Sequence, residues 1–490
     1  MWSTRVLTWD GVLHGLRELM SGGVLLSGNT TSDTDPLQLA LIQMYNRALN
    51  AREAARRLYE FSLRKSQENK VVITSKDVPH GILPQSYSDQ FIHDVKVAGR
   101  GPDDKIYNRN EDIRQMISRG TTLMSWKDSN NEDILDTVLY ANKKFTGGVG
   151  DEDETQPENA QVWRSYCLAD PDSADKVVAM EKINGEAAHF SVRSFEEQLF
   201  IIAGSKNVHM IMGSNDDVEK YIGDRYRIAK EIADAVLKLL DNMEHNKRQI
   251  LFSLLYYTKS TVCCEILLPQ NQHIVNLSYL KEPQIRMFAF TPTCKSDDEP
   301  ESSFTALPPH LGLDLATALN LPCANYEIIP THTVDNFIVQ SRRKVQSEGH
   351  VLYFVKCENG EEHTIGLAKT KTEWYVILRA LREKAVYCFT AGKKKHDWNL
   401  TERIKSTHKR LRELQEWLKF SDEVLSKWTK LSEEFMRWLN EEVNSGGEEA
   451  QQIRPMFPVI WERFCEATNQ TTETNQPRLQ TQLSFSYSSY

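Results

Sequence analysis

The stretch that decides the fold is VAMEKINGE, residues 178–186, in which an apolar run ends at Met180 and Lys182 stands just before Asn184 and Gly185. A free lysine has a pKa of about 10.4, so on the order of one side chain in a thousand or fewer is a neutral nucleophile at pH 7. Burial at the end of an apolar strand, or nearby cations, would lower that pKa and free the amine. Such an amine is suited to attack an α-phosphate and form a phosphoramidate, which makes Lys182 a candidate nucleophile.

The same stretch has a second interpretation. An Asn-Gly pair between apolar runs is a strong hairpin signal, and Lys182 would then be an exposed lysine beside a hairpin turn. In the first interpretation Gly185, which has no side chain, lets a planar base or a phosphate approach the backbone closely. The choice between the two depends on what the rest of the chain contains.

Length and composition describe an ordinary globular protein. The 490 residues suffice for two or three domains, and 40% are hydrophobic and 26% charged. The formal net charge of −9 gives no global basic field, so a surface for nucleic acid would have to be local. The eight cysteines are scattered without a Cys-x-x-Cys pair, which argues against a disulfide framework or a zinc site.

The ends and the apolar runs carry no sign of a membrane or of export. The N-terminus lacks a signal-peptide pattern, and no stretch approaches the roughly 20 apolar residues of a membrane span. We therefore predict an intracellular protein, located in the cytoplasm or the nucleus. We also predict that it is a monomer.

The order of apolar runs predicts an α+β fold. A helical pattern opens at Pro36 and continues to Lys65, and another spans about 216–246. The acidic run at 150–159 is too polar to pack and is expected to be a loop. Strand-like runs are expected in 178–212, 251–290, 337–340, 350–357 and 374–378.

The chain changes character near residue 392. Residues 400–444 have the pattern of one amphipathic helix, and a further helix is expected over about 457–467. We predict an N-terminal helical or extended region at 1–100, a main domain at 101–392, a C-terminal helical domain at 393–468 and a disordered tail at 469–490.

Charged residues lie on or beside the predicted strands of the main domain. Arg119 precedes a strand, Lys144 lies in a basic turn, and Glu265 lies inside an apolar strand, where an acid is costly without a partner. Glu348 stands at the mouth of another strand. Lys369 and Lys371 are two apart, so they share one strand face. A triphosphate with a divalent metal needs such a set of cations, carboxylates and a nucleophile.

In this order the segments resemble the nucleotidyltransferase motifs of covalent ligases and RNA capping enzymes. The most similar branch is that of the ATP-dependent RNA ligases of the phage RNA ligase 1 and eukaryotic tRNA ligase type. The matching segments are EKINGE (181–186), AGSKN (203–207), CEILLPQNQHIV (264–275), EGHV (348–351) and KTKTEWYV (369–376), with SRGTTLM (118–124) and KKFTGG (143–148) upstream. The resemblance covers roughly residues 110–380, and it departs from many relatives in having Asn184 where Asp is commoner.

The resemblance implies a ligase adenylation domain of antiparallel sheets flanked by helices, with ATP and Mg²⁺ (Mn²⁺ as an alternative) as cofactors. It implies these site residues: Lys182 as the AMP-accepting nucleophile; Glu265 on the ribose; Glu348 linked to the metal; Lys369 and Lys371 on the phosphates; Arg119 and Lys144 on the β- and γ-phosphates; and Glu181 and Asn184 as further nucleotide contacts. The implied activity is joining of RNA 5′-phosphate and 3′-hydroxyl ends.

Other interpretations remain open for single residues and for the activity. Arg119 could pair with a surface acid, and Glu265 and Glu348 could be buried ion-pair partners of a lysine. Lys206 could serve merely to shape a turn and have no role in binding. A capping guanylyltransferase, a DNA ligase and an inactive RNA-binding scaffold are the alternative functions. The chain contains no G-x-x-x-x-G-K-[ST] loop and no paired His-x-Thr/Ser elements, so we expect separate kinase and phosphodiesterase enzymes to prepare the RNA ends, as in RNA repair or tRNA splicing.

Overall fold

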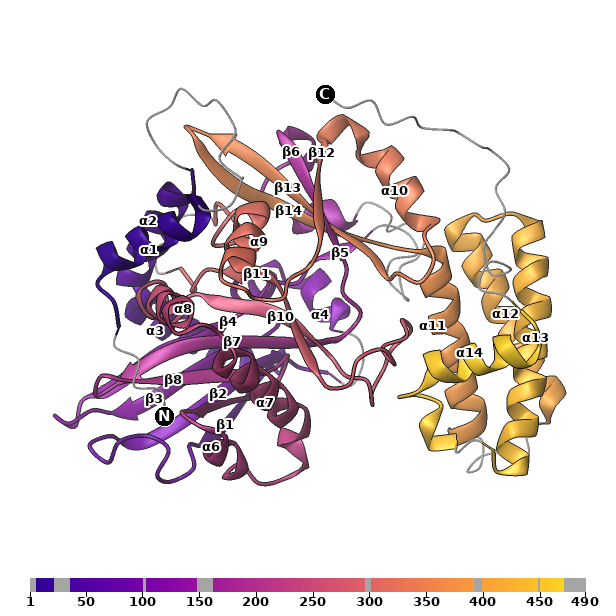
Figure 1. The fold of residues 1–490 in the computed structure, drawn as a ribbon, viewed down its shortest axis with the longest axis horizontal. Coiled ribbons are helices and arrows are strands. Elements are labelled where there is room, and N and C mark those ends of the chain that lie inside the picture. Colours follow the sequence, from indigo (N-terminus) through magenta and orange to yellow (C-terminus); the bar gives the residue numbers. More distant parts are fainter. Residues whose placement is uncertain are drawn as a thin grey trace.

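The computed structural model describes residues 6–21, 36–99, 103–147, 162–295, 301–391, 399–447 and 450–470. Figure 1 shows a larger part that contains the sheets and a separate helical lobe formed by the last helices. The acidic run at 150–159 and almost all of the expected tail lie outside the described residues. Within the described ranges, every helix is too short or too polar to cross a bilayer.

The strands form three sheets, which are antiparallel except for one short parallel pair. The first has the order β1 (Val71–Asp77), β2 (Ser88–Val97), β3 (Thr121–Lys127), β4 (Asp133–Tyr140). The second has the order β11 (Gln284–Thr291), β10 (Thr261–Leu267), β7 (Glu186–Phe195), β8 (Gln198–Ser205), β9 (His209–Met212). The third has the order β12 (Tyr326–Pro330), β6 (Lys176–Glu181), β13 (Gly349–Glu358), β14 (Glu361–Lys371), β5 (Thr146–Gly147).

The stretch at 182–185 joins two different sheets. It follows β6, which pairs with β12 and β13, and precedes β7, which pairs with β8 and β10. The hairpin interpretation of Asn184-Gly185 is therefore wrong. A Cβ on Gly185 would lie 2.4 Å from the carbonyl oxygen of Ile266, so the backbone of β10 already occupies the space that we assigned to a ligand beside this glycine.

Helices cover the sheets and form the C-terminal lobe. Their bounds are α1 (Trp9–Ser21), α2 (Pro36–Leu49), α3 (Ala51–Gln67), α4 (Asp104–Arg109), α5 (Glu111–Met116), α6 (Asn215–Glu219), α7 (Arg227–Asp241), α8 (His245–Thr258), α9 (Pro309–Ala318), α10 (Val334–Arg342), α11 (Glu373–Val386), α12 (Leu400–Leu418), α13 (Asp422–Ser445) and α14 (Phe457–Ala467).

Several predicted elements need correction. The helix expected from Pro36 to Lys65 is two helices that break at Asn50, and the helix expected over 400–444 breaks at Lys419, which has a φ of 58°. The pattern at 216–246 belongs to parts of α6, α7 and α8. Strand-like runs at 251–258, 337–340 and 374–378 are helical in α8, α10 and α11, because periodicity cannot separate strand from buried helix in a short apolar run.

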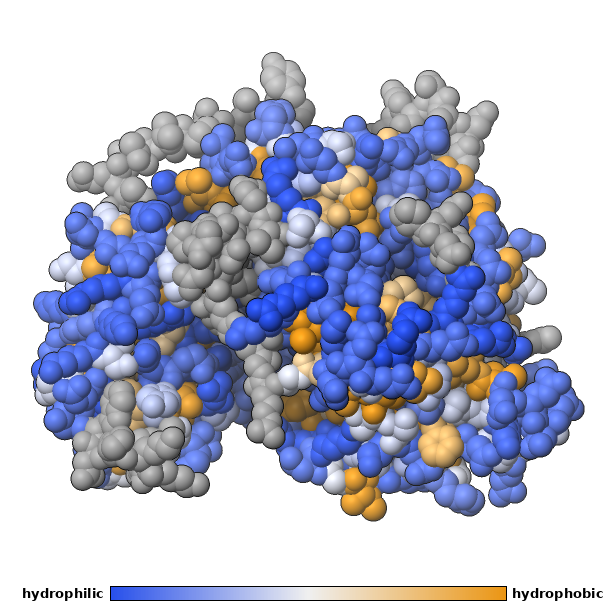
Figure 2. All heavy atoms as spheres, turned by 180° about the vertical axis from the view of Figure 1, so that it is seen from behind, coloured by the Kyte–Doolittle hydropathy of each residue, from blue (hydrophilic) through white to orange (hydrophobic). Residues whose placement is uncertain are grey.

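The two largest of several hydrophobic cores connect the sheets to the helices. The larger one packs the second sheet against α1, α2, α7 and α8. The other joins α11 to the C-terminal helices and includes Ile274 from the segment after β10. From behind, the described surface is mostly hydrophilic, with apolar side chains in small separate patches (Figure 2). The α+β class with antiparallel sheets and a C-terminal helical region is thus confirmed.

Candidate active site

Lys182 lies at one end of the third sheet, next to Glu348. Its backbone N–H donates to the carbonyl of Gly349, and its Nζ lies 2.8 Å from Oε1 of Glu348. Gly349 pairs in register with Lys371 across β13 and β14. Gly349 has a φ of 128°, and a Cβ there would lie 2.0 Å from the carbonyl oxygen of Thr370, so this register requires glycine. Three residues from distant segments, Lys182, Glu348 and Lys371, are thereby brought to one sheet end.

The charge state of this pair differs from the expectation. Burial by itself would lower the pKa of Lys182, but the carboxylates of Glu348 and Glu265 outweigh it and raise that pKa. Burial opposes ionisation of Glu348, while the charges of Lys182 and Lys371 lower its pKa. The prediction that Lys182 has a lowered pKa is therefore wrong for this form of the protein, in which the lysine is an ammonium ion.

Glu265 faces the same site from the second sheet. It lies on β10, and its Oε2 is buried without a hydrogen-bond partner among the described residues. Burial is the main cause that raises its pKa to about 8, although the charge of Lys182 opposes the shift. A buried acceptor with no donor is costly in an empty protein and fits a ligand that brings hydroxyl groups or a cation.

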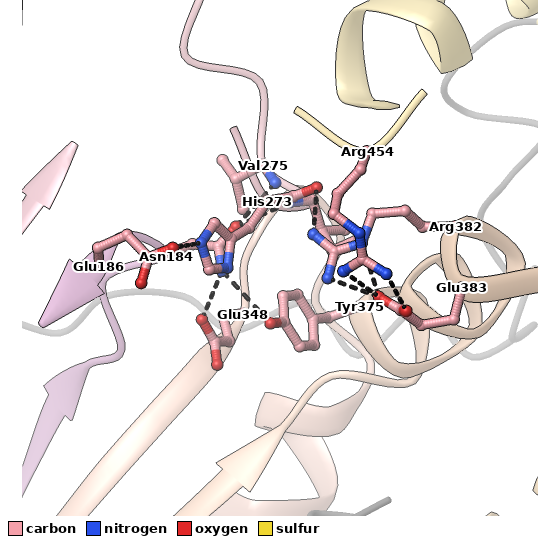
Figure 3. Close-up of polar contacts among 10 residues, drawn as sticks. Asn184, Glu186, His273, Val275, Glu348, Tyr375, Arg382, Glu383 and Arg454 are labelled. Carbon is pink, nitrogen blue, oxygen red and sulfur yellow. Dashed lines mark hydrogen bonds and ion pairs between the residues drawn. The ribbon is translucent and has the colours of Figure 1, made fainter. Parts of the chain in front are cut away.

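Asn184 ties the site to the segment after β10 (Figure 3). Its Nδ2 donates to Oε2 of Glu348 at 2.7 Å and contacts the Tyr375 hydroxyl at 3.4 Å. Its Oδ1 accepts from the backbone N–H groups of Ile274 and Val275, both at 3.0 Å. An amide can donate to one group and accept from another, so this position uses both halves of its side chain.

The same segment reaches the C-terminal lobe. Arg382 donates to the carbonyl of His273 at 3.2 Å and to the carboxylate of Glu383, which also binds Arg454 at 2.7 Å (Figure 3). The backbone N–H of Gln272 donates to the carbonyl of Pro455 at 2.6 Å. A continuous set of polar contacts therefore runs from Glu348 to the helices after residue 399.

A cluster of cations gathers around two carboxylates, Asp103 and Asp104, that no sequence motif predicts. Asp103 Oδ2 lies 3.2 Å from Nε of Arg119 and 2.6 Å from Nζ of Lys206, and its Oδ1 lies 3.5 Å from Nζ of Lys144. Asp104 Oδ1 lies 2.6 Å from the same Lys144 amine. Arg119 and Lys144 are thus brought together, and Lys206, from the AGSKN segment, joins them. The acids have no motif around them, so only their adjacency in the sequence could have drawn attention.

Two further predicted site residues are Lys369 and Glu181. Lys369 lies on β14, where burial and then the charges of Lys371 and Lys144 lower its pKa well below the usual value. A lysine placed among other basic side chains fits a ligand with several negative charges. The carboxylate of Glu181 accepts from the side chain of Asn325 at 3.0 Å at an exposed position, so its part in nucleotide binding stays a prediction.

The residues of this site suit a metal ion that is bound by protein carboxylates and substrate phosphates together. They do not suit a metal ion bound by protein side chains alone. Among the described residues no three His, Cys, Asp or Glu side chains are grouped as a metal cage. Magnesium commonly takes one or two carboxylates and completes its shell with substrate phosphates and water. Glu348, and Glu265 with its open oxygen, could supply those carboxylates.

Fold and site together define an α+β protein with a lysine–carboxylate centre where two antiparallel sheets meet. Residues 90–380, more than half of the chain, match the family described as a domain of unknown function, DUF7920, and the chain belongs to that family. No curated protein sequence matches it.

Some solved structures resemble the chain distantly. One form of an archaeal ATP-dependent RNA ligase is 11% identical with a TM-score of 0.42, over 83% of this chain and 85% of that one. A second form is 12% identical with a TM-score of 0.38, over 68% and 71%. A mutant Naegleria gruberi RNA ligase with ATP and Mn is 12% identical with a TM-score of 0.27, over 42% and 52%. Likenesses this distant leave the activity to be proposed from the site itself.

Proposed function

We propose that this chain is an ATP-dependent RNA ligase that joins 5′-phosphate to 3′-hydroxyl RNA ends through an AMP bound to Lys182. The observation that carries the proposal is the meeting of Lys182, Glu265, Glu348 and Lys371, from four separate segments, where the second and third sheets adjoin. A half-buried lysine beside two carboxylates, with other cations nearby, can accept AMP once its proton has left, because the carboxylates and cations position the nucleotide around the amine.

The first step is attack of the Lys182 amine on the α-phosphorus of ATP. The new N–P bond forms as the bond to pyrophosphate breaks, and the proton of the Lys182 ammonium passes to the Glu348 carboxylate that it contacts. Glu348 holds Lys182 as an ammonium ion at 2.8 Å, so the amine becomes reactive only when this pair is loosened. Lys369 and Lys371 stabilise charge at the α-phosphate, and Arg119, Lys144 and Lys206 orient the departing pyrophosphate.

Glu265 and Glu348 orient the substrate in this scheme. The unpartnered Oε2 of Glu265 accepts from the ribose hydroxyls. A Mg²⁺ or Mn²⁺ ion beside Glu348 would supply charge neutralisation at the phosphates. Asn184 keeps Glu348 in place, which we propose as its role instead of a contact to metal.

Two later steps complete the reaction. The RNA 5′-phosphate attacks the phosphoramidate, which breaks the N–P bond and returns Lys182. The RNA 3′-hydroxyl then attacks the activated 5′-phosphorus and releases AMP. We propose that the enzyme seals only, as a monomer, and that separate kinase and phosphodiesterase enzymes prepare the ends in RNA repair or tRNA splicing in the cytoplasm or nucleus.

A labelling and joining experiment tests this proposal. The full chain is incubated with ATP or GTP labelled at the α-phosphate, and then with RNA or DNA strands that carry 5′-phosphate and 3′-hydroxyl ends. We expect an adduct from ATP, joining of RNA, and no joining of ends that carry 2′,3′-cyclic phosphate. An adduct from GTP alone would favour a capping guanylyltransferase, joining of DNA alone a DNA ligase, and RNA binding without any adduct an inactive scaffold.

A further inference from the structure

The three basic side chains Arg119, Lys144 and Lys206 converge on carboxylates of the same chain. They face Asp103 and Asp104 at 2.6–3.5 Å, and the Lys144 side chain is only 2% exposed. Three cations buried or half-buried so close together repel one another, and two anions between them remove most of that cost. The two carboxylates therefore balance much of the positive charge of this cluster.

The two acids are placed for these cations and not for their own helix. Asp103 stands at the N-cap of α4 (Asp104–Arg109), but its side chain makes no capping hydrogen bond and both of its oxygens face basic groups. Tyr107 is the one buried residue that α4 contributes to the described structure. Figure 1 draws this short helix near the middle of the molecule.

Asp103 and Asp104 bind the same basic side chains that we assign to the phosphates of ATP. Arg119 and Lys144 are the cations that we assign to the β- and γ-phosphates. Burial opposes the ionisation of Asp104, but the charges of Lys144 and Lys369 lower the pKa of this carboxyl group. A carboxylate and a phosphate oxygen use the same donors in the same way. Two carboxylates and two phosphate groups therefore compete for the same set of basic side chains.

We propose that Asp103 and Asp104 are an internal substitute for the two terminal phosphates, an inference that rests on the proposed function. They keep the cations assembled in the empty enzyme and must be displaced when a triphosphate binds. They then return to the cations after AMP transfer and promote the departure of pyrophosphate. A triphosphate has the charge to displace them, so the pair also discriminates against nucleotides with fewer phosphates.

The sign of a binding change distinguishes this proposal from simple positioning. Binding of inorganic pyrophosphate to the full chain is measured by calorimetry for the wild type, Asp103→Asn and Asp104→Asn. Removing a competing charge should tighten binding about tenfold for Asp103→Asn, with a smaller gain for Asp104→Asn. Asp112→Asn is the matched control, since Asp112 is ion-paired with Lys65 at 2.8 Å outside this cluster and should leave binding unchanged. Unchanged or weaker binding in both cluster variants would overturn the proposal.

A second measurement uses the wild type alone and does not depend on how the variants fold. Hydrogen exchange of the amides at 103–109 should become faster when pyrophosphate is added, because α4 loses its ion pairs. Slower or unchanged exchange at saturating pyrophosphate would overturn the displacement. Neither readout requires an AMP adduct, so a failed adenylylation with tightened pyrophosphate binding would count against the proposed function only.

Discussion

At the scale of single residues, the contacts of Asn184 explain why an amide suits this position. Its Nδ2 donates to a carboxylate of Glu348 that is 6% exposed, while its Oδ1 holds two backbone N–H groups. An aspartate would keep the second function but would place a negative charge against Glu348. Glu348 would then have to share Lys182 with a competing acid.

We expect Asn184→Asp to destabilise the protein by about 2 kcal/mol or more, because a hydrogen bond to a buried charged group is lost and a repulsion is gained. Urea unfolding at pH 7 measures this. Asn325→Asp is the matched control, since Asn325 also donates to a carboxylate, that of Glu181, but at an exposed position where the cost should stay below about 1 kcal/mol. Equal losses in the two variants would contradict the assigned role of Asn184.

Glu265 should give the protein a distinct pH dependence. Its folded pKa of about 8 lies above the usual 4.5, so between these values the folded state holds a proton that the unfolded state has lost. Stability then falls as pH rises through this window, by at most roughly 5 kcal/mol at about 1.4 kcal/mol per pKa unit. Glu265→Gln removes this contribution. Relative to wild type, the variant should gain stability from pH 5 to pH 8 in urea unfolding, whereas Glu132→Gln, at an exposed turn, should not.

Many residues of the proposed site could be singled out from the sequence because charged residues on or beside strands are local signals, but their roles come only from the resemblance to ligases and stay predictions. Lys182 follows β6, while Glu348 and Arg119 precede β13 and β3, and the structure brings these strand ends together. The charge state of Lys182 could not be predicted, since it depends on which carboxylates reach it across sheets. Asp103 and Asp104 were missed because nothing around them forms a pattern.

At the scale of elements, the residues between β6 and β7 connect the third sheet to the second. Apolar runs before and after it were predicted correctly as strands, but their pairing was not, because an Asn-Gly turn has the same local sequence in a hairpin and in a crossing between sheets. The decisive contact is the approach of Gly185 to the carbonyl of Ile266, which is distant in sequence.

Gly185→Ala should therefore be costly although it adds one methyl group. The added Cβ would meet the Ile266 carbonyl oxygen at 2.4 Å, and the backbone on both sides must shift, with an expected loss of about 1–3 kcal/mol in the free energy of unfolding. Gly312→Ala, within α9, meets its nearest atom at 3.5 Å and should be neutral or stabilising by up to about 1 kcal/mol. A Gly185→Ala protein as stable as Gly312→Ala would refute the close-contact argument.

At the scale of the whole molecule, the C-terminal lobe shares a core with the part that carries the site. Buried side chains of α11 pack with those of α12, α13 and α14, and Ile274 from beside Asn184 belongs to the same cluster. The first sheet likewise combines strands from before and after residue 100. A change of composition along the sequence predicts a boundary between segments of different structure. It carries no information about the apolar faces that pack against each other across that boundary.

A chain that ends at residue 391 should consequently be less stable, and the proposed nucleotide site should be disturbed. Cutting there exposes the apolar face of α11, including Ile377 and Leu381, and removes Pro455, which accepts from Gln272. We expect a clear fall in Tm and association on size-exclusion chromatography. A chain that ends at Gln470 retains every described contact and serves as the control. A 1–391 protein with the Tm of that control would show that the shared core contributes little.

The most direct test of the account is mass spectrometry of the full chain after incubation with ATP and Mg²⁺. We predict a gain of one AMP in the intact protein, located on Lys182 by peptide mapping. The Lys182→Ala variant should lack this AMP, while Lys176→Ala, changed on the preceding strand, should keep it. No AMP on the intact protein under these conditions, or AMP mapped to another residue, would contradict it.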